Sequence, residues 1–242
     1  RLFANTPRWL HRMPWLKNLV ILRNRHRWLA RIAERLFGIT AKRRLPEAAA
    51  EPFSDAGHET ATATKGTEPN PFEVVLFVDT FSHQYHPETA DSAIEVLQAA
   101  GYRVIVATPS EHSTESERPL CCGRSYLAHG MITEAQTEAR RTLEILQPHA
   151  EAGRTIIGLE PACLLAIRDD YRALHLGEAA LQVSAKAILF EEFIAREVKA
   201  KRFNLTFKPL PLAGKKLLVH GHCHQKAVGA MKSMRRVLKL IP

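Results

Sequence analysis

The chain has 242 residues, 45% of them hydrophobic and 24% charged, which excludes a disordered chain and suits one large or two small folded domains. Its four cysteines are too few for a disulfide scaffold, and clustered cysteine in a chain without a secretory leader pattern favours metal, cluster or redox chemistry. No run of about 18 apolar residues is present, so we expect no membrane span. The last residues, 240–242, fall where a helix should lead into another strand, and we expect a fragment cut at both ends.

The positive charge is concentrated at the start of the chain. Residues 1–45 contain 12 Lys and Arg and one acid, Glu34, whereas the other 197 residues contain 22 basic and 24 acidic residues. Apolar residues recur there at helical spacing and predict an amphipathic helix over about 16–37, stopped by Gly38 and separated by Pro14 from a shorter helical piece. Such a helix suits an anionic membrane, nucleic-acid phosphate or a partner domain, and we favour packing on a partner domain.

The rest of the chain alternates between predicted strands and helices. Residues 46–71 lack a usable period and are expected to form a flexible linker. Short apolar runs predict strands over 73–78, 103–107, 155–158 and 216–220. Helices are predicted over 87–100, 133–147 and most of 181–199, from residue 160 onward, and after Cys223. This order predicts an α/β fold: a Rossmann-like, mostly parallel sheet with helices on both faces, preceded by a basic helical arm.

Several reactive side chains are predicted at one edge of that sheet. Asp79, Cys163 and Cys223 each follow a predicted strand, and the pair Cys121-Cys122 ends the loop after the second strand. The carboxyl ends of parallel strands share one edge, so we expect a common site there. An alternative for the pair alone is that two small apolar side chains are buried at a turn.

Cysteines converging on one edge supply soft thiolate ligands, which suit an iron–sulfur cluster or zinc. The strand–turn–helix junctions are expected to lower the thiol pKa values. His222 and His224 flank Cys223 and are weaker ligand candidates. No Gly-x-Gly-x-x-Gly follows a strand and no phosphate-binding Gly-Lys-Ser/Thr occurs, so neither dinucleotide nor triphosphate binding is supported.

Five motifs in order resemble a known family. Val-Asp-Thr-Phe (78–81), Cys-Cys-Gly-Arg (121–124), Gly-Leu-Glu-Pro-Ala-Cys-Leu (158–164), Phe-Glu-Glu-Phe (190–193) and Gly-His-Cys-His-Gln-Lys-Ala (221–227) are similar to the cysteine-rich CCG region of FAD-linked oxidases. The likeness is to fusions of the D-lactate or D-2-hydroxyglutarate dehydrogenase type, in which a flavin domain and a ferredoxin-like domain precede this region. Related modules occur in the iron–sulfur component of glycolate oxidase and in heterodisulfide reductase.

The resemblance implies a division of the chain and a set of ligands. It gives a basic amphipathic connector (1–45), a flexible linker (46–71), a first CCG-type repeat (72–212) and the start of a truncated second repeat (213–242). It carries over, as ligands of a metal or cluster, Cys121, Cys122, Cys163 and Cys223. Asp79 and Ala166 stand where the family has two further cysteines, so a complete four-thiolate cluster within the first repeat is in doubt.

The favoured interpretation is the electron-transfer segment of an FAD-linked 2-hydroxy-acid dehydrogenase, inactive on its own. Electrons would pass from reduced flavin, bound outside this segment, through iron–sulfur or thiol centres to a quinone or another acceptor. The resemblance implies a cytoplasmic protein, with peripheral contact to the inner face of the cell membrane as an option. The alternatives are a zinc-binding or structural docking domain and, least favoured, a nucleic-acid-binding module built on residues 1–45.

Overall fold

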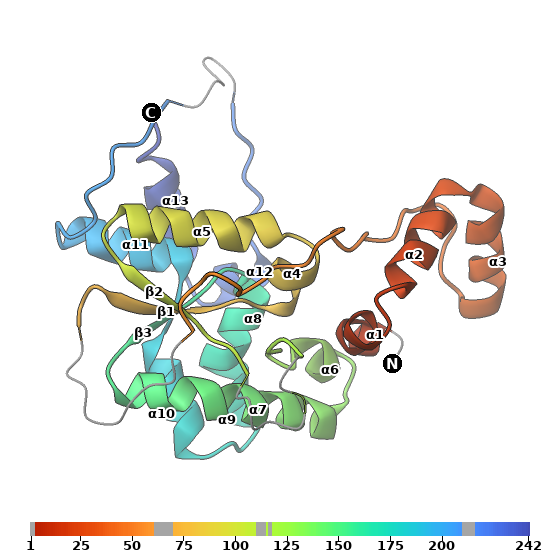
Figure 1. Cartoon of the computed structure of the whole chain (residues 1–242), viewed down its shortest axis with the longest axis horizontal. Helices are drawn as coiled ribbons and strands as arrows, with labels where there is room; N and C mark the ends of the chain where they lie inside the picture. Colours follow the sequence, from red (N-terminus) through yellow and green to blue (C-terminus); the bar gives the residue numbers. More distant parts are fainter. Residues whose placement is uncertain (1–2, 61–69, 110–114, 116–117, 210–215) are drawn as a thin grey trace.

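The structure, a computed structural model, describes residues 3–60, 70–109, 115, 118–209 and 216–242. Four strands form one parallel sheet in the order β2-β1-β3-β4, with bounds β1 Glu73–Phe77, β2 Arg103–Val106, β3 Thr155–Gly158 and β4 Ala187–Leu189. Helices lie on both sides of this sheet (Figure 1). The predicted fold class, a parallel α/β sheet with helices on both faces, is therefore confirmed.

The helices of the body follow the strands in chain order. Their bounds are α4 Thr80–Gln84, α5 Pro87–Ala99, α6 Arg124–Ala128, α7 Ile132–Glu151, α8 Pro161–Leu165, α9 Tyr171–Ala173, α10 Glu178–Lys186, α11 Phe190–Lys199, α12 Cys223–Ala227 and α13 Met231–Leu238. A π-helical turn, Ala166–Asp170, continues α8. The predicted helices over 87–100 and 133–147 correspond to α5 and to the longer α7.

The two-residue period of the strands divides the core between the two faces of the sheet. Val74 and Leu76 of β1 point to one face and pack with Leu97 of α5 and Phe193 of α11. Their neighbours along β1 pack on the other face with residues of α7 and α10. Both faces of the strands are covered, which explains why their sequences are continuously apolar rather than alternating.

The fourth strand is not the one that the sequence predicts. Residues 216–220 form no strand, and Leu217, Leu218 and Val219 are 59%, 93% and 49% exposed. Residues 187–189, expected to be helical, instead pair with β3 as β4. A short apolar run cannot show whether a neighbouring strand is available, and β4 already occupies the position beside β3.

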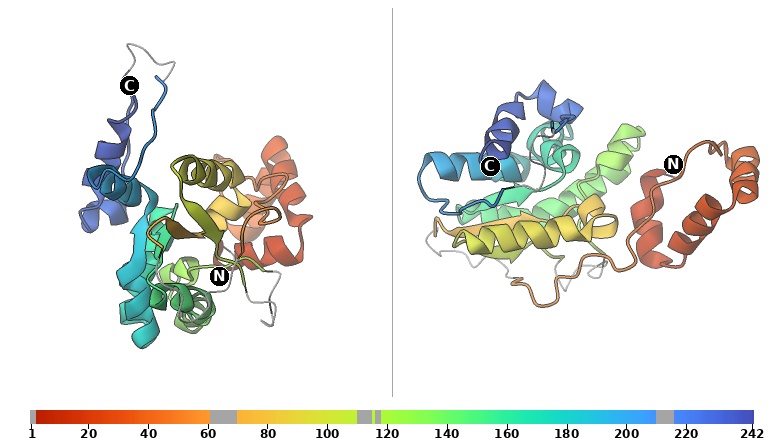
Figure 2. Two further views of the ribbon diagram at one scale, coloured as in Figure 1. Left: turned by 60° about the vertical axis from the view of Figure 1, so that its left-hand side comes forward. Right: turned by 90° about the horizontal axis from the view of Figure 1, so that it is seen from above.

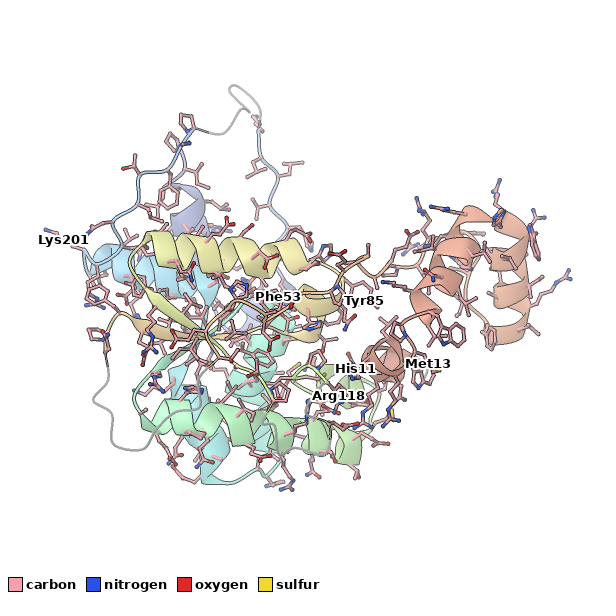
Figure 3. The ribbon with its side chains drawn as sticks, viewed as in Figure 1. His11, Met13, Phe53, Tyr85, Arg118 and Lys201 are labelled. Atoms are coloured by element: carbon pink, nitrogen blue, oxygen red, sulfur yellow. The ribbon has the colours of Figure 1, made fainter. Side chains whose placement is uncertain are left out.

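Much of the predicted linker is docked on the body. The N–H of Ala49 donates to the carbonyl of Gln84 (2.8 Å), and that of Phe53 to the carbonyl of His83 (2.8 Å). The Phe53 ring is buried with residues of the sheet and α5, and Figure 3 shows it directed into the body. Loose tethering is therefore wrong for the described residues 46–60, while 61–69 lie outside the described residues.

Residues 1–45 form three helices: α1 Thr6–Arg12, α2 Leu16–Arg25 and α3 Arg27–Phe37, after a short 3₁₀ turn at Phe3–Asn5. The single helix expected over 16–37 is broken at His26, whose backbone is extended (φ −116°, ψ 107°). Gly38 ends α3 in the left-handed conformation, as predicted (φ 69°). Figures 1 and 2 show α1 beside the body, with α2 and α3 standing away from it.

A buried ionic cluster attaches α1 to the body. The fully buried Glu138 of α7 accepts hydrogen bonds from Arg118 (Nη1 and Nη2, both 2.9 Å) and from Arg8 of α1 (Nη2, 2.9 Å). Arg118 lies on the side of the body that faces α1 (Figure 3). A buried carboxylate depends on such partners because its desolvation is unfavourable.

We predict that Glu138→Ala lowers the free energy of unfolding by about 3–5 kcal/mol, because it leaves the buried Arg118 guanidinium without its main counter-charge. Arg12→Ala, which breaks an exposed pair with Glu115 (3.3 Å), should cost less than about 1 kcal/mol. Urea unfolding followed by circular dichroism measures both. Equal losses in the two variants would contradict the assignment of Glu138 as the anchor.

Candidate thiol site

The site begins where the two central strands end. Phe77 of β1 pairs with Gly158 of β3, so Asp79 and Glu160, each two residues further on, leave the sheet side by side. Asp79 Oδ1 accepts the N–H groups of Phe81 (2.8 Å) and Ser82 (3.1 Å) and caps α4. Glu160 Oε1 accepts the Ala162 N–H (3.1 Å) and caps α8. The second cap places Cys163 in the first turn of α8, where it is buried.

The cysteine pair is held by a tightly fixed turn. Gly123, with φ 78°, is left-handed, and a Cβ on it would lie 2.8 Å from the carbonyl oxygen of Ala135. The glycine after the pair is therefore required by the close approach of α7. Buried hydroxyls fix the preceding carbonyls: Thr142 donates to that of Cys121 (2.9 Å) and Tyr171 to that of Cys122 (3.0 Å).

Three thiols meet in this place. The thiol of Cys122 lies close enough to those of Cys121 and Cys163 for each to act on its pKa, and all three are buried. The Arg124 N–H donates to Cys122 Sγ (3.4 Å). The structure thus brings together three of the four predicted ligands, which we call the thiol row: Cys121, Cys122 and Cys163.

The expected lowering of the thiol pKa values is wrong. The neighbouring Cys122 thiol and burial raise the pKa of Cys121 well above its usual value. The Cys121 thiol acts to lower the pKa of Cys122, but the Cys163 thiol and burial outweigh this effect and raise that pKa strongly. The Cys122 thiol acts to lower the pKa of Cys163, while burial and the Asp79 charge raise it to about 12. All three thiols are therefore neutral at neutral pH.

Other polar groups surround the thiol row. The side chain of Thr80 lies near Cys121 and acts to lower its pKa, and burial raises the pKa of both neighbouring carboxyls, Asp79 and Glu160. Sequence reasoning missed Thr80, although its place directly after Asp79 at the sheet edge was a usable signal. Thr142 and Tyr171 were also missed, because a single polar residue within a helix carries no local signal.

The two positions that depart from the family pattern border the same site. The charge of Asp79 acts on Cys163, which shows that this carboxylate lies near the thiol row. Ala166 is buried in the same apolar cluster as Cys122 and Cys163. It follows Cys163 by three residues in a continuous helical segment, a spacing that puts two side chains on one helix face.

The remaining predicted ligands lie outside the thiol row. Cys223 begins α12, which packs against α8, but its side chain is exposed. His222 caps α12 by accepting the His224 N–H at Nδ1 (3.1 Å). His224 Nε2 faces Asp169 Oδ2 (3.5 Å). Neither histidine is thus engaged as a partner of the three thiols.

The three sulfurs fit an iron–sulfur cluster or zinc in kind, since they are soft thiolate ligands once their protons are displaced. Their arrangement does not match a metal site: within the described residues, no group of three or more His, Cys, Asp or Glu is placed to hold a metal ion, and the thiol row is included in that finding. Metal binding would therefore need the three thiols to rearrange as well as a fourth ligand.

No described helix is both long and apolar enough to cross a bilayer. No family model, curated protein or solved structure matches the chain.

We predict that alkaline pH destabilises the metal-free protein through the thiol row. An unfolded cysteine ionises at about pH 8.5, whereas buried Cys163 keeps its proton until about pH 12, so its stabilisation is complete below the first value and is lost between the two. The free energy of unfolding should fall by up to about 1.4 kcal/mol per thiol for each pH unit above about 8.5. Urea titrations across this range should show a shallower fall for Cys163→Ala, and parallel curves would contradict burial of a neutral thiol.

Proposed function

We propose that the chain is an electron-transfer segment of an FAD-linked 2-hydroxy-acid oxidoreductase and that the thiol row is its working site. One observation carries the proposal: three buried thiols, two from a loop and one from the first turn of α8, lie together at the carboxyl edge of a parallel sheet. The family resemblance of the surrounding motifs supplies the flavin and ferredoxin-like partner domains and a quinone as acceptor.

The thiol row supports the transfer in one of two chemical forms. Cys121, Cys122 and Cys163 would supply three thiolates to an iron–sulfur cluster, which when bound provides one-electron chemistry. Without a cluster, Cys122 and Cys163 are the pair that can be oxidised to a disulfide, since they come from different elements, are buried in one cluster and act on each other's pKa. A disulfide between the adjacent Cys121 and Cys122 would be strained.

In the form without a cluster, electron transfer through a Cys122–Cys163 disulfide balances with a reduced flavin as donor and a quinone as acceptor. A reduced flavin would give two electrons and two protons to the Cys122–Cys163 disulfide, breaking the S–S bond and forming two thiols and oxidised flavin. A quinone would then take two electrons and two protons from these thiols, re-forming the S–S bond and leaving a quinol. Because the raised pKa values keep both thiols protonated, each electron leaves the site with a proton.

Anaerobic expression followed by analysis of iron, acid-labile sulfide, zinc and disulfide content tests the site. We expect either iron and sulfide in comparable amounts or a reducible Cys122–Cys163 disulfide, each lost in Cys122→Ser and Cys163→Ser. Cys223→Ser is the matched control, because its exposed thiol lies outside the thiol row, and it should behave like the unaltered chain.

Two results would contradict the proposal. If the reconstituted protein contains neither iron nor a reducible disulfide, the three thiols only fill space in the core. One equivalent of zinc, lost in Cys163→Ser, would instead support a structural docking domain. Mass spectrometry of alkylated protein identifies the disulfide partners, and circular dichroism shows whether each variant is folded.

Ala166→Cys should strengthen cluster or metal binding. The new thiol would share a helix face with Cys163, in a segment already buried beside the thiol row, and would provide a fourth soft ligand. We expect iron content after reconstitution to rise several-fold over the unaltered chain. Ala173→Cys, in α9 of the same helical region, is the control and should leave it unchanged. If the iron content of the Ala166→Cys variant does not rise, the result favours the disulfide form over the cluster.

A further inference from the structure

The hairpin of α2 and α3 (residues 16–37) has two helix faces without a partner among the described residues. Figures 1 and 2 show these helices away from the α/β body. Their attachment is along one side only. Lys17 donates to the Ala50 carbonyl, and the buried Arg23 binds the carbonyl of Arg43 (2.7 Å), so residues 40–50 fold back along α2.

The outer faces of both helices are apolar. Trp28, Ile32 and Leu36 of α3 recur every four residues and are 60%, 45% and 70% exposed. Trp15 and Leu19 begin another such stripe along α2, and they are 56% and 51% exposed. Side chains four apart lie on one helix face, so each helix presents a continuous apolar stripe rather than scattered exposed residues.

A row of arginines runs beside the α3 stripe. Arg27, Arg31 and Arg35 each precede one of its apolar residues, are exposed and form no ion pair with the described residues. The only acid among residues 1–45, Glu34, accepts the Ala41 N–H (3.1 Å). The α3 side of the hairpin therefore offers apolar contact and positive charge without an acidic partner among the described residues.

We propose that this hairpin is a docking surface for an anionic lipid bilayer. A helix lying in the membrane interface buries Trp, Leu and Phe at the boundary of the acyl chains, while adjacent arginines reach the lipid phosphates. Charge complementarity favours this occupant, because the positive arginines match negatively charged lipid phosphates. The apolar residues beside them differ in size. A bilayer adapts to such a stripe, whereas a protein partner must provide matching pockets.

The proposal is tested with the whole 242-residue chain and vesicles made of equal parts phosphatidylcholine and phosphatidylglycerol. We expect co-sedimentation and a blue shift of tryptophan fluorescence, both weakened by salt and by vesicles of pure phosphatidylcholine. Replacing Arg27, Arg31 and Arg35 with Gln should weaken binding by about 100-fold, since each basic side chain near such a surface contributes roughly one factor of five.

A second variant removes the apolar contact. Replacing Trp28, Ile32 and Leu36 with Ser should abolish binding while leaving the fold intact, because these side chains are exposed. The matched controls are Lys232, Arg235 and Arg236 changed to Gln, and Leu217, Leu218 and Val219 changed to Ser. These make equivalent changes at positions outside the hairpin and should bind like the unaltered chain.

Three results would overturn the proposal. The first is equal binding by the hairpin variants and their controls. The second is no binding to the anionic vesicles, with a concentration-dependent dimer that the apolar variant abolishes, because the face would then join two copies of the chain. The third is no vesicle binding but salt-sensitive binding to a DNA duplex that only the arginine variant loses, because the hairpin would then recognise nucleic acid.

Discussion

The pairing of β1 with β3 is the constraint on which the site depends. Since Phe77 and Gly158 are partners in a parallel ladder, both chains leave the sheet at the same level and in the same direction. Asp79 and Glu160 then turn them into helices by binding free N–H groups. Glycine is required at position 158, because a Cβ there would lie 2.6 Å from Cδ1 of Leu164. The register of the sheet thus sets where β3 ends, where Glu160 caps α8 and therefore where Cys163 lies.

Burial decides the chemistry that these thiols can perform. A helix N-terminus favours a thiolate, but the effect is smaller here than desolvation and the nearby carboxylate charge, so the protons stay in place. Neutral thiols in a closed site resist exchange with free thiols in solution. The thiols can still lose their protons when a metal ion binds in place of those protons, or lose protons together with electrons on oxidation. The same burial therefore suits either proposed form of the site.

Sequence reasoning succeeded where local signals and the global fold agree. The strands at 73–77, 103–106 and 155–158 are apolar runs between clear turn residues, and the edge rule then placed the cysteine pair near Cys163. It failed for Cys223 because that expectation depended on a strand at 216–220, and pairing with a neighbour is a long-range property. The contacts of Thr80 and Tyr171 with the thiol row likewise arise only from tertiary packing. The family resemblance stays a prediction.

The N-terminal arm and the thiol row are physically connected rather than independent features. Arg8 of α1 binds Glu138, and Glu138 also holds Arg118 at the start of the segment that carries the cysteine pair. The negative charge of Glu138 contributes to the raised pKa of Cys121, so the group that anchors the arm also acts on the first thiol. The hairpin has a second connection to the body, because Arg23 of α2 binds the Arg43 carbonyl and the N–H groups of Ala49 and Phe53 donate to carbonyls of α4. If the proposed bilayer contact and the proposed electron transfer both hold, these two connections join the membrane-binding hairpin to the body that carries the thiol row.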